Sequence, residues 1–276
     1  MTYVVLFAVV GFVAGIFGSM VGLGGGVFIV PALTLFLGVP IHDAVAASLI
    51  AVVATSASGS ITYLREGLVN LRLAVSIETA LALGAITGGL VGALLDKGTL
   101  SAIFGAVMMA VSIYMGLRRK VSPRVSVDGA GLGRLGASYV DRELGHTVGY
   151  AVRRLPLGLF VGLVAGNVSG LLGVGGGFLT VPTLRLGMGV PMRAAAATSS
   201  FMLGVTACAG ALVYLVRGAV DPVVTVPVVL GVTAGALVGS SLAARVKSSV
   251  LAVVLAVVLL ALAVQMILAA VGVSIR

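Results

Sequence analysis

The sequence predicts an all-α polytopic membrane protein built from two homologous halves. Three observations lead to this prediction: the composition is apolar, long apolar segments follow one another along the chain, and the second half repeats the first. Hydrophobic residues make up 60% of the 276 residues, whereas charged residues make up only 9%. Because soluble domains carry about 25% charged residues, a chain with so few charges is expected to reside in a membrane.

Long apolar segments account for most of the chain. Most of them reach about 20 residues, the length at which an α-helix spans the hydrocarbon core of a bilayer. They cover residues 1–20, 44–64, 73–95, 100–117, 156–172, 194–216, 223–244 and 250–273, with shorter apolar stretches at 27–37 and 178–186. The sequence therefore predicts about eight to ten membrane segments, two of which are short.

The net charge of +9 is concentrated in one polar stretch. A basic loop between membrane segments is typical of the cytoplasmic side, and anionic lipid headgroups would attract it. We therefore expect a multi-pass protein of the inner, cytoplasmic membrane with membrane lipids as partners. No nucleic-acid-binding module is visible, so a nucleic acid partner is not expected. Eight of the 17 basic residues lie in the stretch: Arg118, Arg119, Lys120, Arg124, Arg134, Arg142, Arg153 and Arg154.

A constant shift of 151 residues relates the first half of the chain to the second. It runs without a gap from Gly15 and Gly166 to Ala85 and Ala236, and self-similarity of this extent indicates a structural repeat. We expect a first repeat over residues 1–117, a basic cytoplasmic linker over 118–155 and a second repeat over 156–276. Matched pairs include Gly24 and Gly175, Pro31 and Pro182, Ser48 and Ser199, Thr55 and Thr206, and Tyr63 and Tyr214.

The orientation of the two halves depends on the short apolar stretches that follow the glycine clusters. Each covers only about half the hydrocarbon thickness. If each counts as its own crossing, or forms a re-entrant hairpin with the helix before it, each half crosses an odd number of times and the second half is inverted. A parallel arrangement with four crossings per half is the alternative. It requires residues 3–37 to cross once, which is too long, so we expect inverted repeats.

The two glycine clusters are the first candidate site. Three consecutive glycines form a poor helix, and a helix break in a membrane is tolerated only where protein, water or substrate satisfies the freed backbone groups. Short, glycine-interrupted segments at matched positions point to the binding site of a transporter. Free N–H groups at the start of the following short helix suit an anion, although tight helix packing is the alternative. The predicted residues are Gly24, Gly25, Gly26, Gly175, Gly176 and Gly177.

Polar side chains within the apolar segments are further candidates. Most serine and threonine hydroxyls in membrane helices bond back to their own helix or bridge to a neighbour. We expect the matched pair Ser48 and Ser199, together with Thr198, to contact the substrate. Asn167 and Ser169 precede the second glycine cluster and could cap the helix or bind. The lone Cys208 lies in an apolar segment, so neither a disulfide framework nor a metal cluster is expected.

Two formal charges lie within apolar segments. Glu78 has no counterpart in the second half, where Val229 stands. Glu78 could couple transport to a proton or another ion, or it could form a structural pair with Arg72. The sequence favours neither alternative over the other. Arg185 stands where the first half has Thr34. It could supply the counter-charge for an anion, but snorkelling towards the membrane surface is the favoured interpretation.

The glycine clusters carry a resemblance to a known family. Each has the pattern G-x-G-G-G, at residues 22–26 and 173–177, and each is followed by an apolar stretch with proline five residues on. Together with Thr198 and Ser199, this double motif resembles the sulfite exporter TauE/SafE family, also called the four-toluene-sulfonate uptake permease family. The resemblance covers both halves.

The resemblance implies a secondary transporter that moves a small sulfur-containing anion, such as sulfite, sulfoacetate or another organosulfonate, by alternating access. An anion channel on the same scaffold and a carrier of a non-sulfur organic anion are the alternatives. No catalytic constellation or phosphate loop is visible, so an enzyme is not expected. No cofactor is expected either, apart from coupling to H⁺ or Na⁺.

Overall fold

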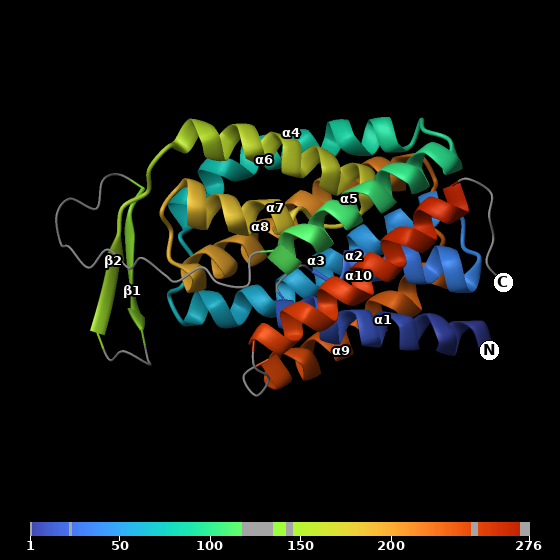
Figure 1. Cartoon of the computed structure of the whole chain (residues 1–276), viewed down its shortest axis with the longest axis horizontal. Coiled ribbons are helices and arrows are strands. Elements are labelled where there is room, and N and C mark those ends of the chain that lie inside the picture. The colour runs from blue at the N-terminus through green and yellow to red at the C-terminus, as the bar shows by residue number, and fades with distance from the viewer. Residues whose placement is uncertain (1, 22–23, 118–134, 142–145, 244–247, 271–276) are drawn as a thin grey trace.

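The computed structural model describes residues 2–21, 24–117, 135–141, 146–243 and 248–270. Its helices run roughly along one long axis, and a β-hairpin projects beyond one end of the helical bundle (Figure 1). The expected all-α fold is confirmed, with the hairpin as an addition that the sequence analysis does not predict.

The element order repeats from one half to the other. The first half contains α1 (Thr2–Val21), α2 (Gly26–Pro31), the π-helix η1 (Ala32–Phe36), α3 (Ile41–Arg65), α4 (Leu71–Gly92) and α5 (Lys97–Leu117). The hairpin strands are β1 (Ala137–Asp141) and β2 (His146–Tyr150). The second half contains α6 (Leu155–Leu172), α7 (Gly177–Pro182), the π-helix η2 (Thr183–Gly187), α8 (Met192–Val216), α9 (Pro222–Ala243) and α10 (Ser248–Ala270).

Within the described residues, five helices are long and apolar enough to cross a membrane: α3, α4, α6, α8 and residues 222–239 of α9. Four shorter apolar helical segments, Tyr3–Ser19, Gly26–Phe36, Lys97–Ile113 and Val257–Ala270, accompany them. Pro31 and Pro182 end α2 and α7. Because proline cannot donate to the preceding turn and crowds it, the wider π turn that follows each proline accommodates the disrupted backbone.

The helices pair across the two halves. α1 packs against α9, and α6 packs against α4. The shift of 151 residues converts the first pair into the second. The matched helices α3 and α8 pack against each other between these pairs, and α5 packs against α10. The bundle is therefore an interlocked pair of repeats, not two separate domains side by side.

Glycines allow the paired helices to touch through their backbones. A Cβ atom at Gly84 in α4 would fall on the Leu163 carbonyl oxygen of α6, and one at Gly235 in α9 would fall on the Phe12 carbonyl oxygen of α1. Phe12 and Leu163 are themselves matched by the repeat. The close approach of transmembrane helices through small residues is thus the same in both halves.

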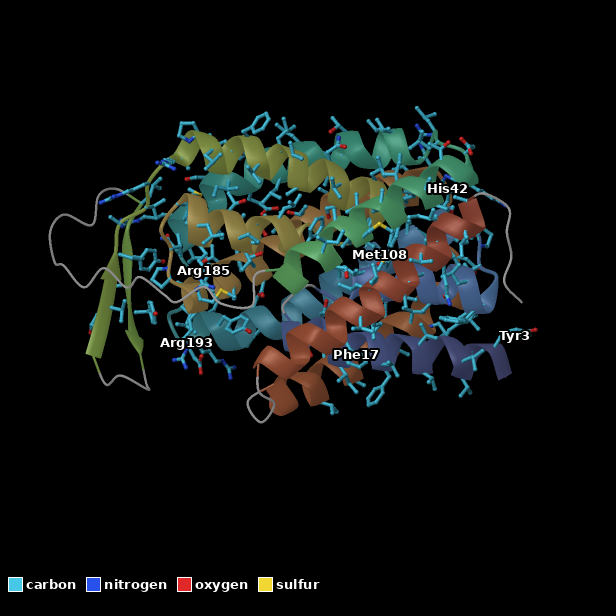
Figure 2. The ribbon with its side chains drawn as sticks, viewed as in Figure 1. Tyr3, Phe17, His42, Met108, Arg185 and Arg193 are labelled. Atoms are coloured by element: carbon cyan, nitrogen blue, oxygen red, sulfur yellow. The ribbon has the colours of Figure 1, made fainter. Side chains whose placement is uncertain are left out.

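Matched elements point in opposite directions along the long axis. α1 begins at the end that carries the N-terminus, whereas α6 begins at the hairpin end (Figure 1). His42 and Arg193 are matched by the repeat, and their side chains lie at opposite ends of the molecule (Figure 2). This arrangement agrees with inverted repeats. Inversion relative to the bilayer stays a prediction.

The β-hairpin occupies part of the expected linker. Tyr139, Val148 and Tyr150 are buried in one hydrophobic cluster with Leu73 of α4 and Met188. The hairpin thereby covers the start of α4. Residues 118–134 and 142–145, which hold most of the basic side chains expected in the linker, lie outside the described residues, so the domain boundaries and the cytoplasmic side of the linker remain predictions.

We predict that Gly84→Ala destabilises the fold, whereas Gly59→Ala does not. Both glycines are helical, and alanine favours a helix over glycine by up to about 1 kcal/mol. At Gly84, however, the added methyl group collides with the α6 backbone, whereas at Gly59 the nearest atom is Tyr63 Cε2 at 4.0 Å. We expect Gly84→Ala to cost about 1–3 kcal/mol. Thermal unfolding in detergent measures the difference, and equal stability of the two variants would contradict the packing between α4 and α6.

Candidate functional site

The glycine clusters form two tight loops that join α1 to α2 and α6 to α7. We define the first glycine loop as Gly24–Gly26 and the second glycine loop as Gly173–Gly177. In the first, the backbone φ angles of Gly24 and Gly25 are 76° and 80°; in the second, those of Gly175 and Gly176 are 82° and 71°. Only glycine adopts this left-handed region readily, which explains why consecutive glycines occur at both positions.

The two glycine loops meet in the interior of the bundle. A Cβ atom at Gly26 would fall on the Gly173 carbonyl oxygen. A Cβ atom at Gly24 would lie 3.0 Å from Val52 Cγ1, and one at Gly175 would lie 3.2 Å from Leu203 Cδ2. Val52 and Leu203 are matched by the repeat and lie near the middle of α3 and α8. The two loops therefore flank one point at which the central helices cross.

The second glycine loop contains buried backbone donors without partners. The Gly173 N–H donates to the Ser169 carbonyl at 2.8 Å, and the Gly176 carbonyl accepts from Leu179 and Thr180 at 3.1 and 3.2 Å. Within the described part of the chain, the N–H groups of residues 174–178 donate no hydrogen bond. Residues 173–177 are all buried. Because a buried N–H without a partner is costly, these groups call for a ligand or water.

Two of the three predicted hydroxyl residues lie at the glycine loops. Ser48 Oγ donates to the Gly173 carbonyl at 2.7 Å, so α3 of one half holds the loop of the other. Ser199 Oγ is 2.6 Å from Thr180 Oγ1, one turn beyond the second loop. The Thr198 hydroxyl instead accepts the Asn70 N–H at 3.0 Å and fixes the start of α4. The structure therefore does not bring Thr198 to the loops.

Asn167 joins two helices and does not face the loop. Its side-chain amide donates to Thr87 Oγ1 of α4 at 3.1 Å. Its neighbour Ser169 is fully buried, and its hydroxyl has no partner within the described structure. A Cβ atom at Gly176 would lie 3.5 Å from Ser169 Cβ, which places this serine beside the second loop.

The sequence analysis does not single out Thr180, although the repeat contains the signal that reveals it. Thr180 stands where the first half has Ile29, and Ser169 stands where the first half has Gly18. At these two matched positions the second half therefore has hydroxyls that the first half lacks. Such a difference is found only when matched positions are also searched for side chains that differ in polarity, and not just for identical residues.

Glu78 lies between α4 and α8. Its Oε1 accepts a hydrogen bond from Thr206 Oγ1 at 2.8 Å, and its Oε2 is buried without a hydrogen-bond partner. The alternative pairing with Arg72 is not formed, because Glu78 has no ion pair within the described part of the chain. Glu78 is thus a partly buried residue with one carboxyl oxygen bonded and the other buried without a partner in the described structure.

Arg185 lies at the hairpin end of the molecule, away from the glycine loops (Figure 2). It belongs to η2, is partly exposed, and has its Nη1 3.7 Å from Met192 Sδ. This placement agrees with snorkelling and does not supply a counter-charge at the loops.

Comparison with known proteins places the whole helical bundle in one family. The model of the family described as "Sulfite exporter TauE/SafE" matches residues 7–266. The probable membrane transporter protein YunE of Bacillus subtilis is 29% identical over 228 residues, which cover 80% of this chain and 81% of YunE. A probable membrane transporter protein of Methanocaldococcus jannaschii is 28% identical over 216 residues, covering 76% of this chain and 72% of the relative. No solved structure matches. With two glycine loops in a duplicated bundle and a family match over nearly its full length, the chain belongs to the sulfite exporter TauE/SafE family of membrane transporters.

Proposed function

We propose that this protein is a secondary transporter that carries a small sulfur-containing anion, such as sulfite, sulfoacetate or another organosulfonate, across the cytoplasmic membrane by alternating access. The family and the names of the relatives support a membrane transporter. The observation that carries the choice of an anion is the set of N–H groups at the buried residues 174–177 and at the partly buried Phe178, which donate no hydrogen bond within the described structure.

The chemistry of the second glycine loop suits an oxyanion. Successive N–H groups in a left-handed turn form a concave donor surface that binds anions. The hydroxyls of Ser169, Thr180 and Ser199 border this surface and add donors. Ser48 donates to the Gly173 carbonyl and so partly neutralises a negative dipole of this loop. A sulfonate or sulfite group presents several acceptor oxygens, so it matches this arrangement without a lysine or arginine.

The first glycine loop would complete the site from the opposite half. Gly24, Gly25 and Gly26 contribute the matched turn, and both loops contact the crossing point of α3 and α8. Movement of the α1–α9 pair relative to the α4–α6 pair, about the crossing of α3 and α8 at Val52 and Leu203, would expose the loops to one side and then to the other. The described residues of both loops are buried, and this occluded arrangement favours a carrier over an open anion channel.

Two experiments test the proposal. Thermal stability of the purified protein is measured against sulfite, thiosulfate, sulfate, sulfoacetate and taurine, and at least one sulfur oxyanion is expected to raise the unfolding temperature by mass action. That anion is then used in liposomes for counterflow. A carrier accumulates labelled anion in exchange for unlabelled anion, whereas dissipation of the gradient without exchange would support the channel. Stabilisation by none of the anions would overturn the assignment.

We predict that Gly176→Ala weakens anion binding at least about tenfold, a loss of roughly 1.4 kcal/mol. The φ angle of 71° at Gly176 strains any residue with a Cβ, and the new methyl group would lie 3.1 Å from the Ala165 carbonyl oxygen. Gly218→Ala is the matched control. Its φ angle is 70°, but no atom lies within 4 Å of the added Cβ. The same loss of binding in both variants would contradict a specific role for the second loop.

We also propose that the two halves are inverted across the membrane. Glu66 and Arg217 are matched by the repeat and exposed, and Ser138 is exposed on the hairpin. In a Cys208→Ser background, single cysteines replacing Glu66 and Ser138 are expected to react with an impermeant thiol reagent from the cytoplasmic side. A cysteine replacing Arg217 is expected to react only from the outside. Labelling of all three positions from one side would contradict the inversion.

A further inference from the structure

Two matched threonines use different partners. Thr55 Oγ1 in α3 donates to the Gly24 carbonyl of the first glycine loop at 3.0 Å. Thr206 Oγ1, its counterpart in α8, donates to Glu78 Oε1 at 2.8 Å. The matched carbonyl, that of Gly175, accepts no hydrogen bond within the described part of the chain. The second half therefore lacks a loop contact that the first half makes.

The matched positions in the first half indicate that the Thr206 hydroxyl can reach the Gly175 carbonyl. Gly24 lies against Val52, one turn before Thr55, and Gly175 lies against Leu203, one turn before Thr206. Thr206 is fully buried between the loop and α4. One rotation about its Cα–Cβ bond would exchange the Glu78 carboxyl for the Gly175 carbonyl as acceptor.

Glu78 has no charged partner on the elements that pack against it. α4 packs against α6 and α8, and α6 carries no ionisable side chain. Within the described residues, Glu78 interacts with none of the ionisable groups on its own helix, on α8 or on the hairpin that covers α4. These groups are Arg72, Arg193, Cys208, Tyr214, Arg217, Tyr139 and Tyr150. A carboxyl that is buried without a counter-ion requires a proton or a bound cation.

A proton fits this position better than a metal cation. Hard cations are held by several oxygen ligands, as calcium and magnesium sites illustrate. In the part of the chain that the structure describes, the Thr206 hydroxyl is the one group that hydrogen-bonds to the Glu78 carboxyl. The described residues contain no cluster of three or more acidic, histidine or cysteine side chains. A single unpartnered oxygen, Oε2, is the place where one proton binds.

We propose that Glu78 carries the coupling proton of this transporter and that Thr206 passes its protonation state to the second glycine loop. In the ionised state, Glu78 Oε1 holds the Thr206 hydroxyl. When a proton from water binds to Oε2, the carboxyl becomes neutral and a weaker acceptor. The Thr206 hydroxyl then turns to the Gly175 carbonyl, as Thr55 already does with Gly24.

The consequence for transport rests on the proposed function. Protonation removes a negative charge near the second glycine loop and gives that loop the support that the first one has. Anion binding is therefore stronger to the protonated protein, and by reciprocity the bound anion raises proton occupancy. The protein would move its anion together with a proton.

The first arm of the test needs no anion. Infrared spectra of the purified protein are compared between about pH 5 and 8. We expect one protonated-carboxyl band that titrates, disappears in Glu78→Gln and shifts in Thr206→Val. Thr55→Val is the matched control, because it removes the equivalent hydroxyl, which donates to the Gly24 carbonyl and not to Glu78, and it should leave the band in place. A missing band, or an equal shift in both threonine variants, would overturn the proposal.

The second arm measures proton uptake on binding of thiosulfate or sulfate, which stay ionised in this range. Calorimetry in buffers of different ionisation enthalpy is expected to show up to one proton taken up per anion. As the pH rises, the affinity for the anion should fall by up to about tenfold per pH unit, which is the limit for one linked proton. In Glu78→Gln both effects should vanish while binding persists. Binding without proton uptake in the wild type would refute the coupling alone, whereas binding of no anion would refute the proposed function.

Discussion

A helix that breaks inside an apolar interior must find partners for the backbone groups it frees, and the rest of this structure depends on that constraint. Both breaks occur at matched glycine loops, and at each of them a hydroxyl of the protein satisfies one carbonyl. Ser48 donates to Gly173, and Thr55 donates to Gly24. The N–H groups of residues 174–178 are not satisfied in this way within the described structure. At each loop a hydroxyl therefore satisfies one freed carbonyl, whereas these amides of the second loop have no acceptor within the described structure, which is the condition for binding an anion.

The helix pairs explain how two such breaks can be held together. Glycines at the contacts between α1 and α9 and between α4 and α6 bring these helices to backbone contact. This leaves α3 and α8 to cross between the pairs, with Val52 and Leu203 separating the loops. Because each helix pair combines elements of both halves, a movement of one half must be accompanied by a movement of the other. In our proposal, this coupled movement of helices from both halves exposes the loops first to one side of the membrane and then to the other.

The repeat made much of the architecture predictable from the sequence. Consecutive glycines at matched positions predicted the broken helices, because no other residue adopts the required backbone conformation readily. The contact between the loops could not be predicted, since it depends on how α3 and α8 cross. The contacts of Asn167 and Thr198 could not be predicted either, because helix pairing directs both side chains to α4, and their role in binding stays a prediction. The hairpin was missed because its strands are short and lie in a stretch dominated by charge.

The comparison of matched positions shows where the halves differ, and those differences lie at the second glycine loop. Ser169 and Thr180 have no hydroxyl equivalents in the first half, and the Thr206–Glu78 contact has no matched counterpart because Val229 stands at the position matched to Glu78. A duplicated scaffold thus combines a symmetric framework with one specialised loop. The loop's hydroxyls serve recognition in our proposal, and its neighbouring carboxyl serves coupling.

The most direct test of the central claim is an experimental density map of the protein saturated with the sulfur oxyanion that stabilises it most. The account predicts density for the anion at the second glycine loop, with its oxygens about 2.7–3.2 Å from backbone nitrogens within residues 174–178. Density for the anion at the arginines of the hairpin end, with the loop amides bonded to water or protein instead, would contradict it.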